Sequence, residues 1–163
     1  GVALFGLQFA RLHGARVIVV SGSEDKRAKA LALGATHALA READWPAEAM
    51  RLTEGRGAEH VLETVGGANL GRSLQALARG GRVSVIGVLE GAEISASAFE
   101  TIGRRAVIQG VSVGHRSALE RMVRAIDLNG IEPVIAAEYG FDEVPRAFEH
   151  LARGAFGKVV VRM

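Results

Sequence analysis

Glycines follow two apolar segments of the chain at the positions where a strand is expected to end. Val65-Gly66-Gly67 comes after the segment 60–64, and Gly87-Val88 closes the segment 82–87. Glycine lets a backbone approach a ligand closely, and the ligands of open parallel sheets lie at the carboxyl ends of the strands. These residues are candidates for contacting a ligand, although glycines also end strands for conformational reasons alone.

Residue types used in covalent or metal-assisted catalysis are sparse. The chain has no Cys, which excludes disulfides, a thiolate zinc site and a cysteine nucleophile within these residues. The five histidines lie far apart, with no pair in H-x3-H spacing: His13, His37, His60, His115 and His150. We therefore assign no catalytic residue and no metal ligand. Glu63 is interpreted as a structural acid, and His115 and Arg116 as exposed loop residues.

Composition restricts the class of protein. Of 163 residues, 48% are hydrophobic and 23% are charged, which is typical of a soluble globular chain. The net charge of +2 is small and gives no indication of a nucleic-acid partner. No stretch approaches the roughly 18 apolar residues of a membrane span, so no membrane partner is expected. No signal peptide is recognisable, and with the absence of cysteine this favours a cytoplasmic location.

Apolar β-branched segments alternate with helical ones, which predicts an α/β fold with a doubly wound parallel sheet. Strands are expected at 16–20, 36–39, 60–64, 82–87, 106–111, 134–137 and 158–162. Helices are expected at 2–12, 24–33, 46–53, 69–78, 117–129 and 143–153, with a short one after Ser97. We expect Asn69 to cap its helix and Gly80-Gly81 to end it. A domain boundary is placed near residue 113, separating 1–113 from 114–163.

Five segments, in order, resemble the zinc-type medium-chain dehydrogenase/reductase (alcohol dehydrogenase) family. They are Gly1–Ala10, Gly34-Ala35, Glu63–Gly67, Gly80–Gly87 and Phe156–Val160. The similarity covers the whole chain. It implies a Rossmann-type coenzyme-binding domain in 1–113 and a short α+β tail in 114–163 that belongs to the family's catalytic domain.

The start of the chain, Gly1-Val2-Ala3, resembles the amino end of the helix that follows the first Rossmann strand. In the family a strand and two further glycines precede this helix, and no complete G-x-G-x-x-G occurs in the chain. We therefore expect the first strand and the N-terminal catalytic domain to be missing, and the chain to fold poorly alone. The resemblance implies that Gly1 and Val2 lie at the coenzyme phosphates and that Lys158 faces the pyrophosphate; Lys158 is equally compatible with a solvated side chain.

The end of the second Rossmann strand carries information about the coenzyme. NAD enzymes place an acid there to bind the ribose hydroxyl, whereas this chain has Ser21, with Lys26 and Arg27 one turn later. Cations attract a 2′-phosphate, so NADP is favoured over NAD. The alternative is that Ser21 and Glu24 form a capping box and that the two cations are solvated.

The resemblance also implies contacts at the nicotinamide end of the coenzyme. Val65 and Gly66 lie just beyond the end of a strand, and Gly87 and Val88 border the nicotinamide ribose. Val111 and Val113 offer backbone groups to the carboxamide.

The implied function is hydride transfer between NAD(P) and an alcohol or carbonyl substrate. Zinc is implied by the family, with its ligands outside this chain. A zinc-free NADPH quinone reductase of the same superfamily stays open, as does a nucleotide-binding module without catalysis. A methyltransferase is disfavoured by Ser21. The resemblance implies a homodimer or homotetramer, with 106–113 as the candidate interface.

Overall fold

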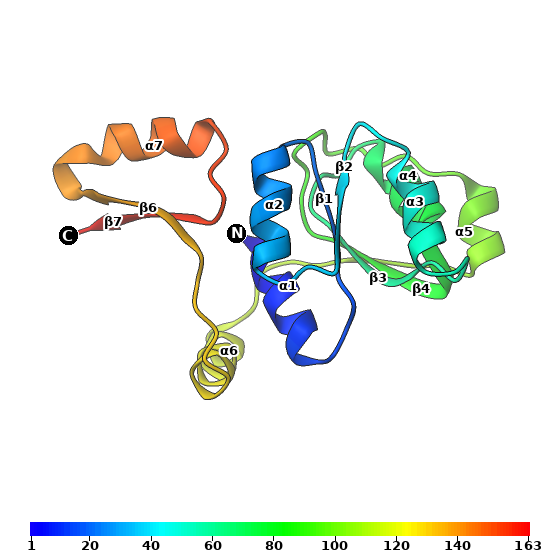
Figure 1. Ribbon diagram of the computed structural model, residues 1–163, viewed down its shortest axis with the longest axis horizontal. Helices are drawn as coiled ribbons and strands as arrows, with labels where there is room; N and C mark the ends of the chain where they lie inside the picture. Colours follow the sequence, from blue (N-terminus) through cyan, green and yellow to red (C-terminus); the bar gives the residue numbers. More distant parts are fainter. The chain divides into compact units, whose positions relative to one another are not determined.

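The computed structural model describes all 163 residues and confirms an α/β fold with parallel strands (Figure 1). Contacts divide the chain into two compact units, one of residues 17–114 and one of residues 1–16 with 115–163. Every strand pair is parallel, and helices connect most neighbouring strands. No helix combines the length and the apolar character needed to cross a membrane.

The unit 17–114 holds two parallel sheets. The first pairs β1 (Ile18–Ser21) with β2 (His37–Ala40); the second has the order β3 (Ala58–Glu63), β4 (Leu77–Val85), β5 (Val107–Gly110). In the doubly wound order 3-2-1-4-5-6 these are strands 3-2 and 4-5-6. β1 pairs only with β2, and β3 pairs only with β4, so each has one open edge where strand 1 of that order would lie.

Four helices of this unit connect the strands, and local side chains set three of their starts. They are α2 (Glu24–Ala32), α3 (Trp45–Leu52), α4 (Asn69–Gln75) and α5 (Ala98–Arg104). Ser23, Asp44 and Ser97 each accept a hydrogen bond from a backbone N–H of the first turn, which supplies an acceptor that the helix itself lacks. On α3, Arg51 donates to Glu48 and holds the pKa of that carboxyl below its usual value.

Two apolar clusters hold these elements together. One joins α4 to the second sheet through Leu70, Leu74, Leu77 and Val83. The other joins α3 to the first sheet and consists of Trp45, Ala49 and Ala76, with Ile18, Val20 and Leu39 packed against it. The β-branched residues that predicted the strands therefore supply much of the buried surface between sheet and helix.

The region around α4 differs from the sequence expectation. Asn69 is the first residue of the helix rather than its cap, and its side chain bonds elsewhere. The helix ends at Gln75, and Gly80-Gly81 lie inside β4. The register of β3 against β4 shifts between Ala58 and His60, whose partners are Leu77 and Arg82, so the glycines form an irregular, bulged stretch within the strand.

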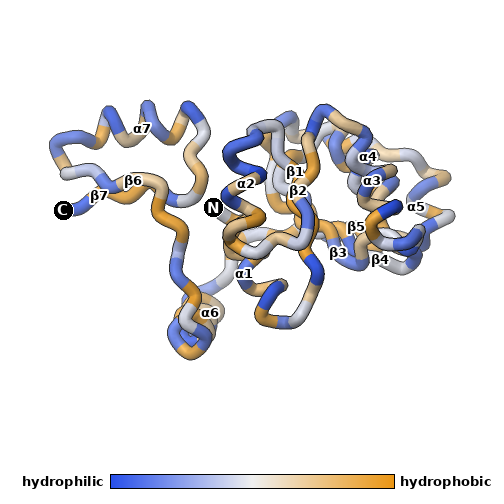
Figure 2. The backbone as a smooth tube through the Cα atoms, in the orientation of Figure 1, coloured by the Kyte–Doolittle hydropathy of each residue, from blue (hydrophilic) through white to orange (hydrophobic).

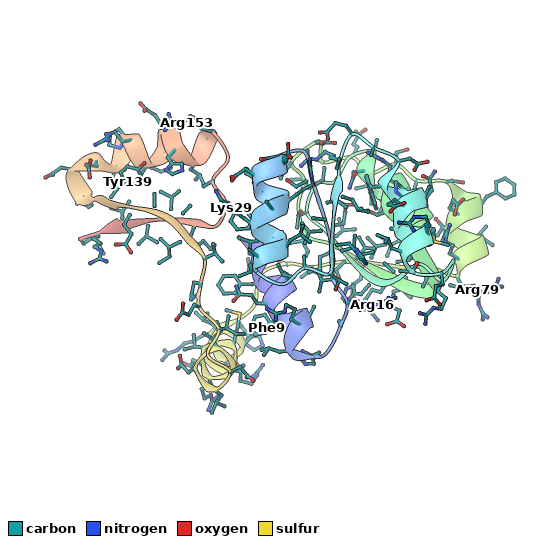
Figure 3. The ribbon with its side chains drawn as sticks, in the orientation of Figure 1. Phe9, Arg16, Lys29, Arg79, Tyr139 and Arg153 are labelled. Atoms are coloured by element: carbon teal, nitrogen blue, oxygen red, sulfur yellow. The ribbon has the colours of Figure 1, made fainter.

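The second unit contains a β–α–β arrangement. β6 (Ile135–Gly140) pairs in parallel with β7 (Lys158–Arg162), and a short 3-10 turn (Phe141–Glu143) and α7 (Val144–Ala152) connect them. Figure 2 shows hydrophilic and hydrophobic residues alternating within the turns of α7, which is the pattern of a helix with one apolar face. Tyr139 lies under this helix, where its hydroxyl is 3.0 Å from His150 Nδ1 (Figure 3).

The same unit includes α1 (Val2–Leu12) and α6 (Arg116–Leu128). A capping box of Ser117 with Glu120, which the spacing of these residues allows, does not form at α6. Instead His115 is the cap: its Nδ1 accepts the Ala118 N–H, and Glu120 pairs with Arg116 at 2.8 Å. Both residues are exposed, as expected, but Arg116 is the first residue of α6 rather than part of a loop, and His115 is the residue that caps it.

Candidate functional site

The junction between β1 and α2 holds three of the predicted residues. Ser23 caps the helix, and the Ser21 Oγ accepts the Ser23 N–H at 3.3 Å, so the predicted capping box of Ser21 with Glu24 is not formed. The Arg27 guanidinium donates to the Ser21 carbonyl at 2.8 Å and thus lies over the end of the strand. Lys26 is partly buried on the same turn, and no carboxylate pairs with its ammonium.

An acid that the sequence did not single out faces this junction. A Cβ built on Gly22 would lie 2.7 Å from Glu42 Oε1, so the carboxylate stands directly beside the glycine. Glu42 follows β2, the neighbour of β1 in the sheet, and its side chain is exposed. The end of β1 therefore has both cations and an acid within its immediate surroundings.

The junction between β3 and α4 is organised by a buried carboxylate. Glu63 is 2% exposed and accepts hydrogen bonds from the Val65 and Gly66 N–H groups at 2.8 and 3.1 Å. Its other oxygen accepts from Asn69 Nδ2 at 2.8 Å and from Ser73 Oγ at 2.5 Å. The interpretation of Glu63 as a structural acid agrees with these contacts, and the contacts fix the backbone of two predicted ligand-binding residues.

The loops after β3 and β4 contact each other backbone to backbone. A Cβ on Gly66 would lie 2.8 Å from the Gly87 carbonyl oxygen and 3.0 Å from the Val88 Cα. A Cβ on Gly87 would lie 2.6 Å from the Thr64 carbonyl carbon. Side chains cannot fit there, so glycine is required at both positions, and the structure brings Val65, Gly66, Gly87 and Val88 together.

The remaining residues predicted for this end of the ligand follow β5. The Val111 N–H donates to the Val85 carbonyl at 2.9 Å, which continues the β4–β5 pairing. Val88, Val111 and Val113 are exposed, at 60%, 45% and 95%. Exposed apolar side chains at the carboxyl edge of a parallel sheet are suited to contact a flat, partly apolar ligand such as a nicotinamide ring.

Three predicted residues belong to the other unit. Gly1 caps α1, and Val2 is its first residue. A Cβ on Gly1 would lie 3.4 Å from Lys158 Nζ, so the lysine at the start of β7 reaches the amino end of the helix. First-turn N–H groups and an ammonium together form an arrangement that favours an anion.

Conventional catalytic groups do not assemble in this chain. No three His, Cys, Asp or Glu residues lie together in a metal-binding group. Gly110-Val111-Ser112-Val113-Gly114 has the G-x-S-x-G spacing of a serine nucleophile, but no histidine bonds to Ser112. His60 instead contacts Ser84 at 2.8 Å between neighbouring strands.

Comparison with known families identifies the chain. The family model for zinc-binding dehydrogenases matches residues 1–127. The chain belongs to the zinc-binding dehydrogenase family. This membership agrees with the parallel sheets and with the glycines at the strand ends.

Individual relatives give the same result. The chain is 35% identical to a zinc-type alcohol dehydrogenase-like protein of Schizosaccharomyces pombe, over 100% of the chain and 49% of the relative. It superposes on the structure of a proposed alcohol dehydrogenase of Sinorhizobium meliloti 1021 with a TM-score of 0.95 and 54% identity, covering 100% of this chain and 48% of that one.

A second structure, of an NAD-dependent alcohol dehydrogenase, has a TM-score of 0.87 and 32% identity and is covered to the same extent, 100% and 48%. The chain therefore spans about half the length of the relatives that it matches.

Sequence reasoning missed two parts of the candidate site. Glu42 is distant from Gly22 in sequence and meets it only because β1 and β2 are neighbours. Asn69 and Ser73 are one helical turn apart, a spacing that places both on one face of α4, toward the acid that ends the preceding strand. That spacing is the signal that could have revealed the Glu63 contacts.

Proposed function

We propose that this chain supplies coenzyme binding to an oxidoreductase that transfers a hydride between NAD(P) and an alcohol or carbonyl substrate. Residues 1–113 form the dinucleotide-binding domain in this proposal, and residues 114–163 are the C-terminal segment of the catalytic domain. The activity belongs to the full-length, cytoplasmic enzyme, and this chain alone is inactive. The observation that carries the proposal is the close approach of Gly66 to Gly87, which leaves no room for a side chain between the two loops at the carboxyl edge of the sheet.

Each group of predicted residues has a role in this proposal. The N–H groups at the start of α1 and the Lys158 ammonium bind the pyrophosphate. Ser21, Lys26 and Arg27 bind the adenosine ribose with its phosphate. The loops after β3 and β4 hold the nicotinamide ribose, while the backbone of Val111 and Val113 meets the carboxamide. The nicotinamide ring, when bound, accepts or donates the hydride.

The residues of this chain have no role in binding zinc in this proposal. The family's metal would need Cys, His or acidic ligands, and this chain contains no Cys and no group of three potential ligands. The proposal therefore assigns the ligands to the catalytic domain outside this chain. What this chain's residues do is orient the coenzyme so that its reactive face meets the substrate.

NADP is the proposed coenzyme. Ser21 lacks the charge that would repel a 2′-phosphate, and Arg27 and Lys26 lie on the first turn beside it. Glu42 acts in the opposite direction, because its carboxylate faces Gly22 and repels a second phosphate. Glu24 also lies on the first turn of α2, whereas Asp25 pairs with Lys29. The position of Arg27 over the end of β1 is therefore the feature that favours the phosphate.

The test is a titration of the full-length protein with NADPH and with NADH, followed by thermal unfolding. A ligand at 100 times its Kd stabilises by about 2.7 kcal/mol, and each kcal/mol raises the Tm by about 2–4 °C in a chain of 150–250 residues, so a rise of several degrees is expected. We expect a larger rise with NADPH. A larger rise with NADH would refute the choice of NADP but would leave the proposed oxidoreductase function intact. No rise with either coenzyme would refute the proposed function.

A further inference from the structure

We propose that Glu63 is a positioning residue for the coenzyme, because its buried carboxylate sets the backbone of both loops that receive the nicotinamide end. This inference rests on the proposed function. It goes beyond that function by assigning a task to a side chain that need not touch the coenzyme.

The two oxygens of the carboxylate have separate partners. Oε1 accepts the N–H groups of Val65 and Gly66, in the loop, while Oε2 accepts from Asn69 and Ser73, on α4. A carboxylate offers about four acceptor sites, so its capacity is fully used. Glu63 thus ties the loop to the helix through a single rigid group.

All four donors are neutral, and no Lys, Arg or His pairs with Glu63. A charge at 2% exposure is costly to bury, and an apolar side chain would fill the same volume at lower cost. An apolar side chain would leave the two loop N–H groups without an acceptor. The carboxylate therefore serves to fix the orientation of the loop rather than to stabilise the core.

The position of the loop after β3 also determines the position of the loop after β4. The Val65 carbonyl accepts the Glu90 N–H at 2.9 Å, and the Glu63 carbonyl accepts the Ile86 N–H at 2.8 Å. Gly66 is in turn packed against Gly87 and Val88. A shift of the Val65–Gly66 backbone must displace the loop after β4, so one carboxylate controls both sides of the proposed nicotinamide pocket.

The Glu63→Gln variant keeps the shape of the side chain and removes one acceptor oxygen. Its amide group must face two donors, either the loop N–H groups or the Asn69 and Ser73 side chains. We expect the Kd of the coenzyme to rise about tenfold, since a buried donor without an acceptor is expensive. The fluorescence of the bound reduced nicotinamide should also change, because its pocket loosens.

The matched control is Val83→Ala. Val83 is fully buried in the cluster beside α4 and has no contact in the Glu63 network, so this variant lowers the Tm without altering the loops. We expect its Kd and its nicotinamide fluorescence to equal those of the wild type. Ser73→Ala removes one donor to Oε2, and about a threefold rise in Kd is expected.

The measurement is a fluorescence titration of each full-length variant with the reduced coenzyme that the wild type binds more tightly, together with its Tm. A rise in Kd for Glu63→Gln that exceeds that of Val83→Ala supports the inference. Equal values of Kd in the two variants overturn it and leave the coenzyme function intact. If Glu63→Gln fails to fold, Ser73→Ala decides: an unchanged Kd overturns the inference. A wild type that binds neither coenzyme overturns the proposed function itself.

Discussion

Charges around a single glycine set the proposed coenzyme choice at the residue scale. Gly22 provides the space, Arg27 is anchored on the Ser21 carbonyl, and the Glu42 carboxylate stands beside the glycine. A 2′-phosphate would meet the cations and the acid together, whereas a ribose hydroxyl could donate to the acid. Discrimination between the two coenzymes is then a difference between opposing electrostatic contributions, and single substitutions should shift it in predictable directions.

Glu42→Gln should raise the preference of the full-length enzyme for NADPH over NADH. The substitution removes the repulsion of the phosphate and weakens the acceptor for the ribose hydroxyl, so we expect the ratio of the two Kd values to change about fivefold toward NADPH. Lys26→Ala should change the ratio in the opposite direction. Isothermal titration with each coenzyme measures both ratios.

The control is Glu59→Gln, which removes the same charge from an exposed residue near the start of β3, away from the carboxyl edge of the sheet. Its ratio should equal that of the wild type. If Glu59→Gln shifts the ratio of Kd values as much as Glu42→Gln does, the shift arises from the net charge of the protein. Glu42 would then have no specific contact with the ribose.

At the element scale, the strands were predictable where β-branched runs fix the buried faces. The predicted strands 16–20 and 158–162 lie close to the observed β1 and β7. The ends of α4 were not predictable, because the tertiary partner Glu63 takes the Asn69 side chain and because Gly80-Gly81 suit a bulge as well as a helix end. The candidate loops followed from glycine placement, whereas the contacts that hold them depend on which strands become neighbours.

β5 is an edge strand, and its open edge lies within residues 106–113, the candidate interface between subunits. Val111 donates toward β4, so by the alternation of a parallel strand the Ile108 N–H points to the open side. We expect Ile108→Lys to shift the full-length protein from a dimer or tetramer toward the monomer, since a charge on an edge opposes pairing with a second copy. Analytical ultracentrifugation measures the mass.

Phe99→Lys is the matched control for this edge. It places the same charge on α5, where the phenyl ring is 91% exposed and lies outside the strand edge. The mass of this variant should equal that of the wild type. A wild type that is already monomeric, or a loss of mass in both variants, would contradict an interface at β5.

At the scale of the whole molecule, the strands of residues 17–114 form two separate sheets rather than one continuous sheet. β1 and β3 each have an open edge, and in the doubly wound order both would pair with one central strand. Val61, next to this edge, packs against the core only in part. A central strand buries apolar side chains on both faces and satisfies backbone groups on both edges, so its contribution is comparable to the entire stability of a domain, about 5–15 kcal/mol.

Residues 1–163 expressed alone should therefore lack a cooperative thermal transition. Without a strand between β1 and β3, no strand pairing connects the two sheets. The connections that remain between them are the apolar cluster around Trp45 and contacts such as those from Arg72 to the Arg41 and Ala43 carbonyls. Calorimetry should show a broad, weak transition for this chain, and a single sharp one for the full-length protein. Addition of the coenzyme at 100 times the full-length Kd should not restore cooperativity, because ligand binding adds only about 2.7 kcal/mol. A sharp transition of the isolated chain would mean that the clusters around Leu74 and Trp45 suffice to hold the sheets, and that the central strand serves the coenzyme rather than the fold.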